Sequence, residues 1–172
     1  MRRVEVESYN YQWPAMFEKE ATKLRAVFGN ELVAIHHIGS TSVIGLAAKP
    51  VIDIMPVVRV IEQVDFYNGE MEEIGYEAKG ENGIPGRRYF QKGGENRTHH
   101  VHVFEEGIRH VERHLAFRDY LRKHPNAAKE YSDLKRELAK RYPSDMESYI
   151  IGKNHLVLTL EEAAVKWYQE VK

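Results

Sequence analysis

The sequence predicts an α+β fold, with strands in the first two thirds of the chain and helices in the last third. Apolar runs at 32–38 and 50–58 are short and bounded by glycine or proline, which is typical of strands. Segments 87–92 and 98–104 flank a glycine-rich turn and predict an antiparallel pair. From residue 109 onward, apolar residues recur at helical spacing.

The remaining elements follow from local signals. Trp13–Phe28 has Pro14 in its first turn and Gly29 after its last, which predicts a helix. A second helix is expected over 60–74, with Phe66 among its apolar contacts, and a short strand over 75–78. The C-terminal helices are expected over 109–123, 127–141 and 145–171, the last with a bend near Gly152.

Composition limits the classes of function. The chain has 172 residues, 42% of them hydrophobic and 30% charged, which predicts one globular domain over 1–172. Its net charge of -1 gives no reason to expect nucleic acid or membrane partners. With no cysteine, no apolar signal segment and no membrane-spanning run, a cytoplasmic location is predicted. Nothing in the composition specifies the oligomeric state.

The stretch with the clearest chemistry begins where the first strand ends. Gly39 is followed by Ser40, Thr41 and Ser42, whose hydroxyl groups and backbone N–H groups can bind an anion. We expect a short helix or helical turn over 43–48, with Ser42 near its N-cap. Asp53 then lies within the apolar strand 50–58, and a carboxylate there needs compensation of its charge. The pattern fits a nucleotide phosphate and its metal, or simply a tight turn and a local salt bridge.

A second group of polar residues lies in the predicted antiparallel pair. Strand alternation places His100 and His102 on one face and His99 on the other. Two such imidazoles can be metal ligands or phosphate donors, or only a polar strand face. Arg87 and Arg88 alternate in the same way, so at most one can point toward Asp53.

Two other clusters are less specific. His110 and His114 have the i, i+4 spacing of zinc ligands, but the metalloprotease glutamate is missing, so a helix surface is the simpler interpretation. The helix over 109–123 carries a run of basic residues that forms either a basic wall or, as is usual for charged helix faces, a solvated surface. The run comprises Arg113, Arg118, Arg122 and Lys123 with Tyr120.

Six motifs together resemble the GrpB family, and they occur in the right order over nearly the whole chain. They are His37–Ser42, Gly45–Pro50, Ile52–Ile54, Gly83–Arg88, Thr98–Val103 and Phe117–Arg122. The resemblance implies a nucleotidyltransferase-like fold, with a mixed, mainly antiparallel sheet and flanking helices. It also implies that Gly39–Ser40 is a phosphate-binding turn and that Asp53 is the first metal carboxylate.

One position departs from the pattern that the resemblance implies. Enzymes of the nucleotidyltransferase superfamily generally carry a second carboxylate two residues after the first, where this chain has Met55. The strand expected to supply a third carboxylate offers His100 and His102 instead. Losing oxygen ligands weakens a magnesium site, whereas imidazole favours ions such as zinc.

The leading hypothesis is a protein that binds a nucleotide or another phosphorylated ligand between Ser40 and Asp53. In its enzyme form, a metal-dependent nucleotidyl or phosphoryl transferase with unknown acceptor, Asp53 and His102 are catalytic. Asp53, His100 and His102 would bind magnesium, manganese or zinc. The phosphates would be bound by Gly39, Ser40, Thr41, Ser42, Lys49, Arg87 and Arg88. The alternatives are a catalytically degenerate nucleotide-binding module and a histidine-rich metal-dependent hydrolase that also uses His99.

Overall fold

The computed structural model describes residues 3–172, and residues 1 and 2 lie outside the described part. The chain divides into two compact units. A sheet unit comprises residues 12–38 and 51–111, and a helical unit comprises residues 3–11, 39–50 and 112–172. Both units are built from segments far apart in the sequence.

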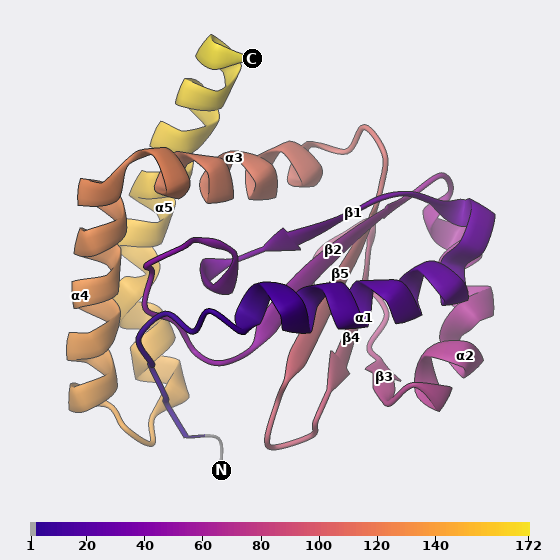
Figure 1. Cartoon of the computed structure of the whole chain (residues 1–172), viewed down its shortest axis with the longest axis horizontal. Coiled ribbons are helices and arrows are strands. Elements are labelled where there is room, and N and C mark those ends of the chain that lie inside the picture. Colours follow the sequence, from indigo (N-terminus) through magenta and orange to yellow (C-terminus); the bar gives the residue numbers. More distant parts are fainter. Residues whose placement is uncertain (1–2) are drawn as a thin grey trace. The chain divides into compact units, whose positions relative to one another are not determined.

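The sheet unit contains five strands in the order β1-β2-β5-β4-β3 (Figure 1). They are β1 (Leu32–Ile38), β2 (Ile52–Val58), β3 (Tyr76–Ala78), β4 (Arg87–Lys92) and β5 (His99–Glu105). Only β2 and β5 pair in parallel; the other neighbours are antiparallel. The predicted mixed, mainly antiparallel sheet is therefore confirmed, with each predicted strand within about two residues of its place.

Helix α1 (Trp13–Phe28) packs against β1 and β2. Proline in its first turn and Gly29, whose φ is 53°, set its two ends as predicted. Its buried apolar stripe includes Phe17, Leu24 and Phe28, and the Phe17 ring stacks on His37 of β1 at 4.9 Å between centroids. The helix therefore covers this face of the sheet over β1 and β2.

The predicted helix over 60–74 is only partly present. Residues Ile61–Tyr67 form a 3₁₀ helix, and α2 covers only Asn68–Glu73. Ile61 and Val64, three residues apart, are the buried positions of the first segment, which suits the 3₁₀ period. Phe66 is 79% exposed, so its predicted apolar contact is wrong.

The segment after β1 also differs from the prediction. Ser40–Ser42 form a 3₁₀ turn, and residues 43–48 contain no helix. The Ser42 hydroxyl bonds back to the Gly39 carbonyl instead of capping a helix that follows. Gly45 has a φ of 86°, which interrupts a right-handed helix, and Ala48 then forms a β-bridge with Glu7.

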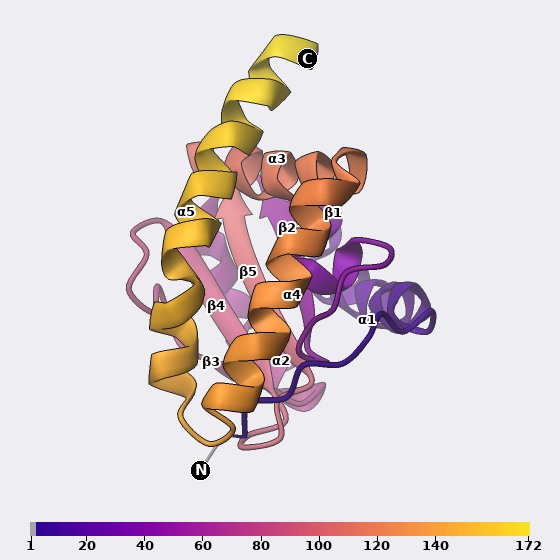
Figure 2. The ribbon, with the colours of Figure 1, turned by 90° about the vertical axis from the view of Figure 1, so that its left-hand side faces the viewer.

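Three helices form most of the helical unit: α3 (Arg109–Lys123), α4 (Pro125–Arg141) and α5 (Met146–Val171). Figure 2 shows α4 and α5 side by side, and they are in contact. Pro125 begins α4 instead of preceding it. Helix α5 continues without a break through Gly152, where a Cβ would lie 2.6 Å from Leu138 Cδ2 on α4; the bend expected there stays a prediction. Among residues 3–172, no helix has the length and apolar character needed to cross a membrane.

Candidate functional site

The Asp53 carboxylate lies next to two imidazoles. Because β2 and β5 are parallel neighbours, Asp53 is in register with His100, and alternation places His102 on the same face. Asp53 Oδ1 is 3.0 Å from His102 Nε2 and 3.5 Å from His100 Nδ1. The three side chains remain 27%, 15% and 17% exposed, in the order Asp53, His102, His100. The predicted shared face of these strands is therefore confirmed.

The surroundings keep Asp53 ionised. Burial alone would raise the pKa of this carboxyl, but the hydrogen bonds from His100 and His102 lower it far below its usual value. A carboxylate that stays charged and reachable from solvent can bind a cation.

Each imidazole also faces an arginine on its other ring nitrogen. Arg87 Nη1 lies 3.5 Å from His102 Nδ1, and Arg97 Nη1 lies 3.5 Å from His100 Nε2. A guanidinium can only donate, so this arrangement assigns the proton of each neutral imidazole to the nitrogen that faces Asp53. Metal-bound histidines usually donate their outer N–H to an acceptor. Metal binding here would therefore require a change of tautomer.

The two adjacent arginines of β4 have different surroundings. Arg87 is buried on the Asp53 face, with its guanidinium 4.9 Å from the centre of the Tyr89 ring. Arg88 donates to Asp65 at 2.8 Å. Arg97, in the turn before β5, was missed by sequence reasoning; its position three residues before His100 was the available signal.

The ligand atoms of Asp53, His100 and His102 all lie within 4.8 Å of one another. One carboxylate and two imidazoles suit zinc or a similar transition metal better than magnesium, which prefers oxygen ligands. Met55 is fully buried and pairs with His36 of β1, so it adds no oxygen ligand. The donor set therefore fits a transition-metal ion.

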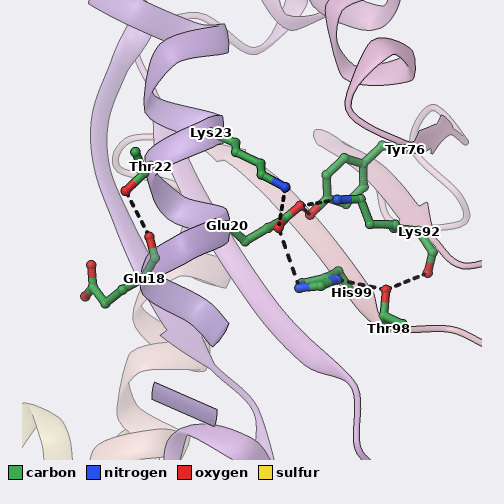
Figure 3. A network of polar contacts seen from close by, with 8 residues as sticks. All are labelled: Glu18, Glu20, Thr22, Lys23, Tyr76, Lys92, Thr98 and His99. Atoms are coloured by element: carbon green, nitrogen blue, oxygen red, sulfur yellow. Dashed lines mark hydrogen bonds and ion pairs between the residues drawn. The ribbon is translucent and has the colours of Figure 1, made fainter. Parts of the chain in front are cut away.

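His99 belongs to a different network, on the α1 side of the sheet. Its Nε2 lies 3.8 Å from Glu20 Oε2, and Glu20 also accepts hydrogen bonds from Tyr76 and Lys92 (Figure 3). His99 is therefore turned away from Asp53. The version of the hydrolase hypothesis that used three adjacent histidines is not supported by this geometry.

The predicted phosphate turn lies in the helical unit. Gly39 has a φ of 72°, a conformation that favours glycine, and Thr41 and Ser42 are buried. Lys135 of α4 donates to Ser40 Oγ at 2.8 Å. Its side chain is 2% exposed, which is unusual for lysine. Its ammonium group also lies 4.2 Å from the centre of the Tyr131 ring, which stabilises the positive charge beside the turn.

Sequence reasoning missed Lys135, although it lies four residues after Tyr131 on the predicted apolar stripe of α4. Arg122, noted only as part of a basic helix face, donates from Nε and Nη2 to the Ser42 carbonyl at 3.0 and 2.7 Å. Two cations from α3 and α4 thus hold the two ends of the 3₁₀ turn. That this turn and Asp53 bind one ligand stays a prediction.

Other predicted site residues have structural contacts. The Lys49 ammonium lies 3.9 Å from Met146 Sδ and over the Tyr149 ring. His110 stacks on Phe104 at 5.3 Å, and His114 Nε2 lies 3.4 Å from an Arg113 nitrogen. Neither histidine belongs to a metal-capable cluster among residues 3–172. The phosphate-binding role expected of Lys49 stays a prediction.

The family model described as "GrpB protein" matches residues 3–163 of this chain. The chain belongs to the GrpB family. It is 54% identical over 166 residues to "UPF0157 protein YqkA" of Bacillus subtilis, covering 96% of this chain but 48% of that protein. This GrpB-family chain thus spans about half the length of that relative. The crystal structure of the conserved protein GrpB from Enterococcus faecalis superposes with a TM-score of 0.93 at 43% identity, covering 96% of this chain and 99% of that one.

A more distant structural likeness shows the fold class. Cid1 poly(U) polymerase with MgGTP bound superposes with a TM-score of 0.54 at 14% identity, covering 78% of this chain and 44% of that one. The nucleotidyltransferase-like fold implied by the family resemblance is therefore confirmed.

Proposed function

We propose that this GrpB-family chain binds a nucleotide or another phosphorylated ligand together with a divalent metal ion. The observation that carries the proposal is the Asp53 carboxylate between the imidazoles of His100 and His102, partly open to solvent. In this fold class, a metal ion bound by the sheet would offset phosphate charge, which is the main requirement of nucleotide chemistry.

Zinc is the ion that this donor set favours, ahead of manganese. Asp53 would supply the oxygen ligand, and His100 and His102 the nitrogen ligands, after their outer nitrogens take up the ring protons. Metal affinity should rise with pH, because a protonated imidazole cannot bind metal. Magnesium should bind more weakly than either ion.

The phosphate groups are assigned to the turn that follows β1. Gly39, Ser40, Thr41 and Ser42 would supply the donors, and Lys135 the positive charge. Arg87 is the cation of the sheet unit that lies beside the metal ligands. Ser40→Ala should weaken nucleotide binding by about 1–2 kcal/mol, the cost of one lost hydrogen bond to a charged group.

Binding without turnover is favoured over nucleotidyl transfer by one observation. Met55 occupies the place of a second carboxylate and is fully buried. A site with a single carboxylate stabilises the charge of a transferring phosphate less well. A transferase with an unknown acceptor is the second candidate, supported by the Asp53–His102 pair.

The test is calorimetry on untagged, metal-free protein. Zinc, manganese and magnesium are titrated first, followed by ATP, GTP, CTP, UTP and inorganic phosphate, with pyrophosphate release measured in parallel. We expect Asp53→Asn to abolish metal binding and Ser40→Ala to weaken nucleotide binding, while Ser148→Ala, at the start of α5, changes neither. If the wild type binds none of these ligands with or without metal, the proposal is wrong.

A further inference from the structure

A cavity of about 410 Å³ lies in the helical unit, at the C-terminal ends of α3 and α5. Arg122 and Lys123 line it from α3, and Trp167, Tyr168 and Lys172 line it from the end of α5. The two helices cross near this end of α5 (Figure 1). A volume of this size is typical of sites for small molecules.

An aromatic cluster fixes the Trp167 ring. Tyr120 and His124 stack on each other at 4.0 Å between centroids. Trp167 meets both rings edge to face, at 5.8 Å from Tyr120 and 5.4 Å from His124. These contacts hold the indole in place while it remains partly exposed, so it offers a rigid surface for stacking, at low entropic cost to a flat ligand.

The charges of the cavity favour an anion. It carries three cations, Arg122, Lys123 and Lys172, and one carboxylate, Asp119. That carboxylate accepts a hydrogen bond from Arg118 at 2.8 Å and lies 3.7 Å from Arg122 Nη1. Lys172 lies 3.9 Å from Glu112, whereas exposed Lys123 has no carboxylate partner within residues 3–172. A stacking surface beside uncompensated positive charge suits a phosphorylated aromatic compound.

One side chain joins this cavity to the proposed phosphate turn. Arg122 lines the cavity and donates two hydrogen bonds to the Ser42 carbonyl. A ligand that moves Arg122 in the cavity would therefore change its hydrogen bonds to the turn.

We infer that the cavity between α3 and α5 binds the base of a nucleotide, stacked on Trp167 with Lys123 near its phosphate or ribose. The inference rests on the proposed function and deepens it, because it selects nucleotides over phosphate esters that lack a ring.

The chain has two tryptophans, and the other, Trp13, is buried in the sheet unit, so fluorescence can report on the cavity. ATP should quench the fluorescence of the wild type, and tripolyphosphate, which has no ring, should not. Trp167→Leu should lose the quenching and bind ATP about tenfold more weakly, as expected for one lost base-stacking contact, with unchanged affinity for tripolyphosphate. Lys123→Gln should weaken ATP binding about threefold, and Lys166→Gln, exposed on α5 outside the cavity, should not.

The outcomes separate the cavity from the phosphate turn. Equal affinity for ATP and tripolyphosphate, unchanged in Trp167→Leu, would overturn the base site and leave phosphate binding intact. ATP binding that survives Ser40→Ala but is lost in Trp167→Leu would support the cavity and contradict the turn. If the wild type binds neither ATP nor tripolyphosphate, both the base site and the phosphate turn are wrong. If circular dichroism shows that Trp167→Leu does not fold, the test is the comparison of Lys123→Gln with Lys166→Gln. Equal ATP affinity of these two variants would overturn the base site.

Discussion

Two carboxylates meet the adjacent residues His99 and His100 of β5 on opposite faces of one sheet, and their surroundings differ. Glu20 of α1 is only 4% exposed in its side chain and is held by Lys92, Tyr76 and His99 (Figure 3). Asp53 of β2 is 27% exposed and is held by His100 and His102. The Glu20 network is closed by an ammonium group, whereas the Asp53 group remains open. A closed network stabilises the packing of α1, and an open one can accept a ligand.

The largest expected effect comes from adding a carboxylate to the open site. Met55→Asp should destabilise the metal-free protein by about 4 kcal/mol, because the new charge is buried without compensation. Manganese or magnesium should recover part of this loss and bind more tightly than to the wild type. Thermal melting with and without metal measures both effects.

The volume-matched variant Met55→Leu is the control, and it should neither lose much stability nor respond to metal. Pyrophosphate release should be followed in the same samples. Robust turnover by the wild type that disappears in Met55→Asp would show that the site works with its present ligands, and binding without catalysis would then be wrong. If neither the wild type nor Met55→Asp responds to any metal, Asp53 is not part of a metal site.

The closed network can be broken from its cationic side. Lys92→Met should cost about 3 kcal/mol in urea unfolding, at the low end for a broken buried pair, because Lys92 is 20% exposed. Zinc binding at Asp53 should not change. Combining Lys92→Met with Glu20→Gln should restore part of the stability. A loss in the single variant below about 0.5 kcal/mol, typical of a surface change, would contradict the contrast between the two carboxylates.

Acid should act on the closed network in two ranges. Burial raises the pKa of Glu20, but the hydrogen bonds from Lys92 and Tyr76 lower it more, so the net pKa is below its usual value. The Glu20 contribution to stability is therefore present above about pH 4.3, the usual glutamate pKa, and is lost as pH falls further. Burial lowers the pKa of His99, so some stability is already lost below about pH 6.5.

Urea unfolding of the wild type and Glu20→Gln from pH 7 to pH 3 tests this expectation. The difference in unfolding free energy should rise slightly from pH 7 to about pH 4.3, because the charge of Glu20 raises the pKa of His99, and it should shrink below that pH. A difference that keeps growing below about pH 4.3 would contradict the assignment.

The smallest effect concerns the arginine beside the open site. Arg87→Gln should tighten zinc binding about two- to fivefold, because it removes a positive charge and supplies an acceptor for the outer N–H of His102. The same variant should weaken ATP binding. Arg88→Gln is the matched control, since Arg88 bonds to Asp65 and should affect neither ligand. Calorimetric titration of both variants measures the effect. If Arg87→Gln and Arg88→Gln bind zinc with equal affinity, Arg87 does not influence the metal site.

The sequence by itself determined the local elements and much of the Asp53 group. Alternation and flanking glycines predicted the strands and placed His100 and His102 on one face, because the period of a strand is local. The ends of α1 followed from Pro14 and Gly29, which act within one turn. The family resemblance supplied the fold class and singled out Gly39–Ser40 and Asp53.

Only the tertiary structure decided which distant residues meet. The parallel pairing of β2 with β5 brings Asp53 into register with His100, and residues so far apart leave no periodic signal. Lys135 reached Ser40 from a position that periodicity assigns to the apolar core. Local patterns also failed over 43–48, where Gly45 in a left-handed conformation and a bridge to Glu7 replace a helix. At these places, long-range hydrogen bonds and burial outweighed local preference. Such contacts depend on residues far away in the chain, so the local sequence does not predict them.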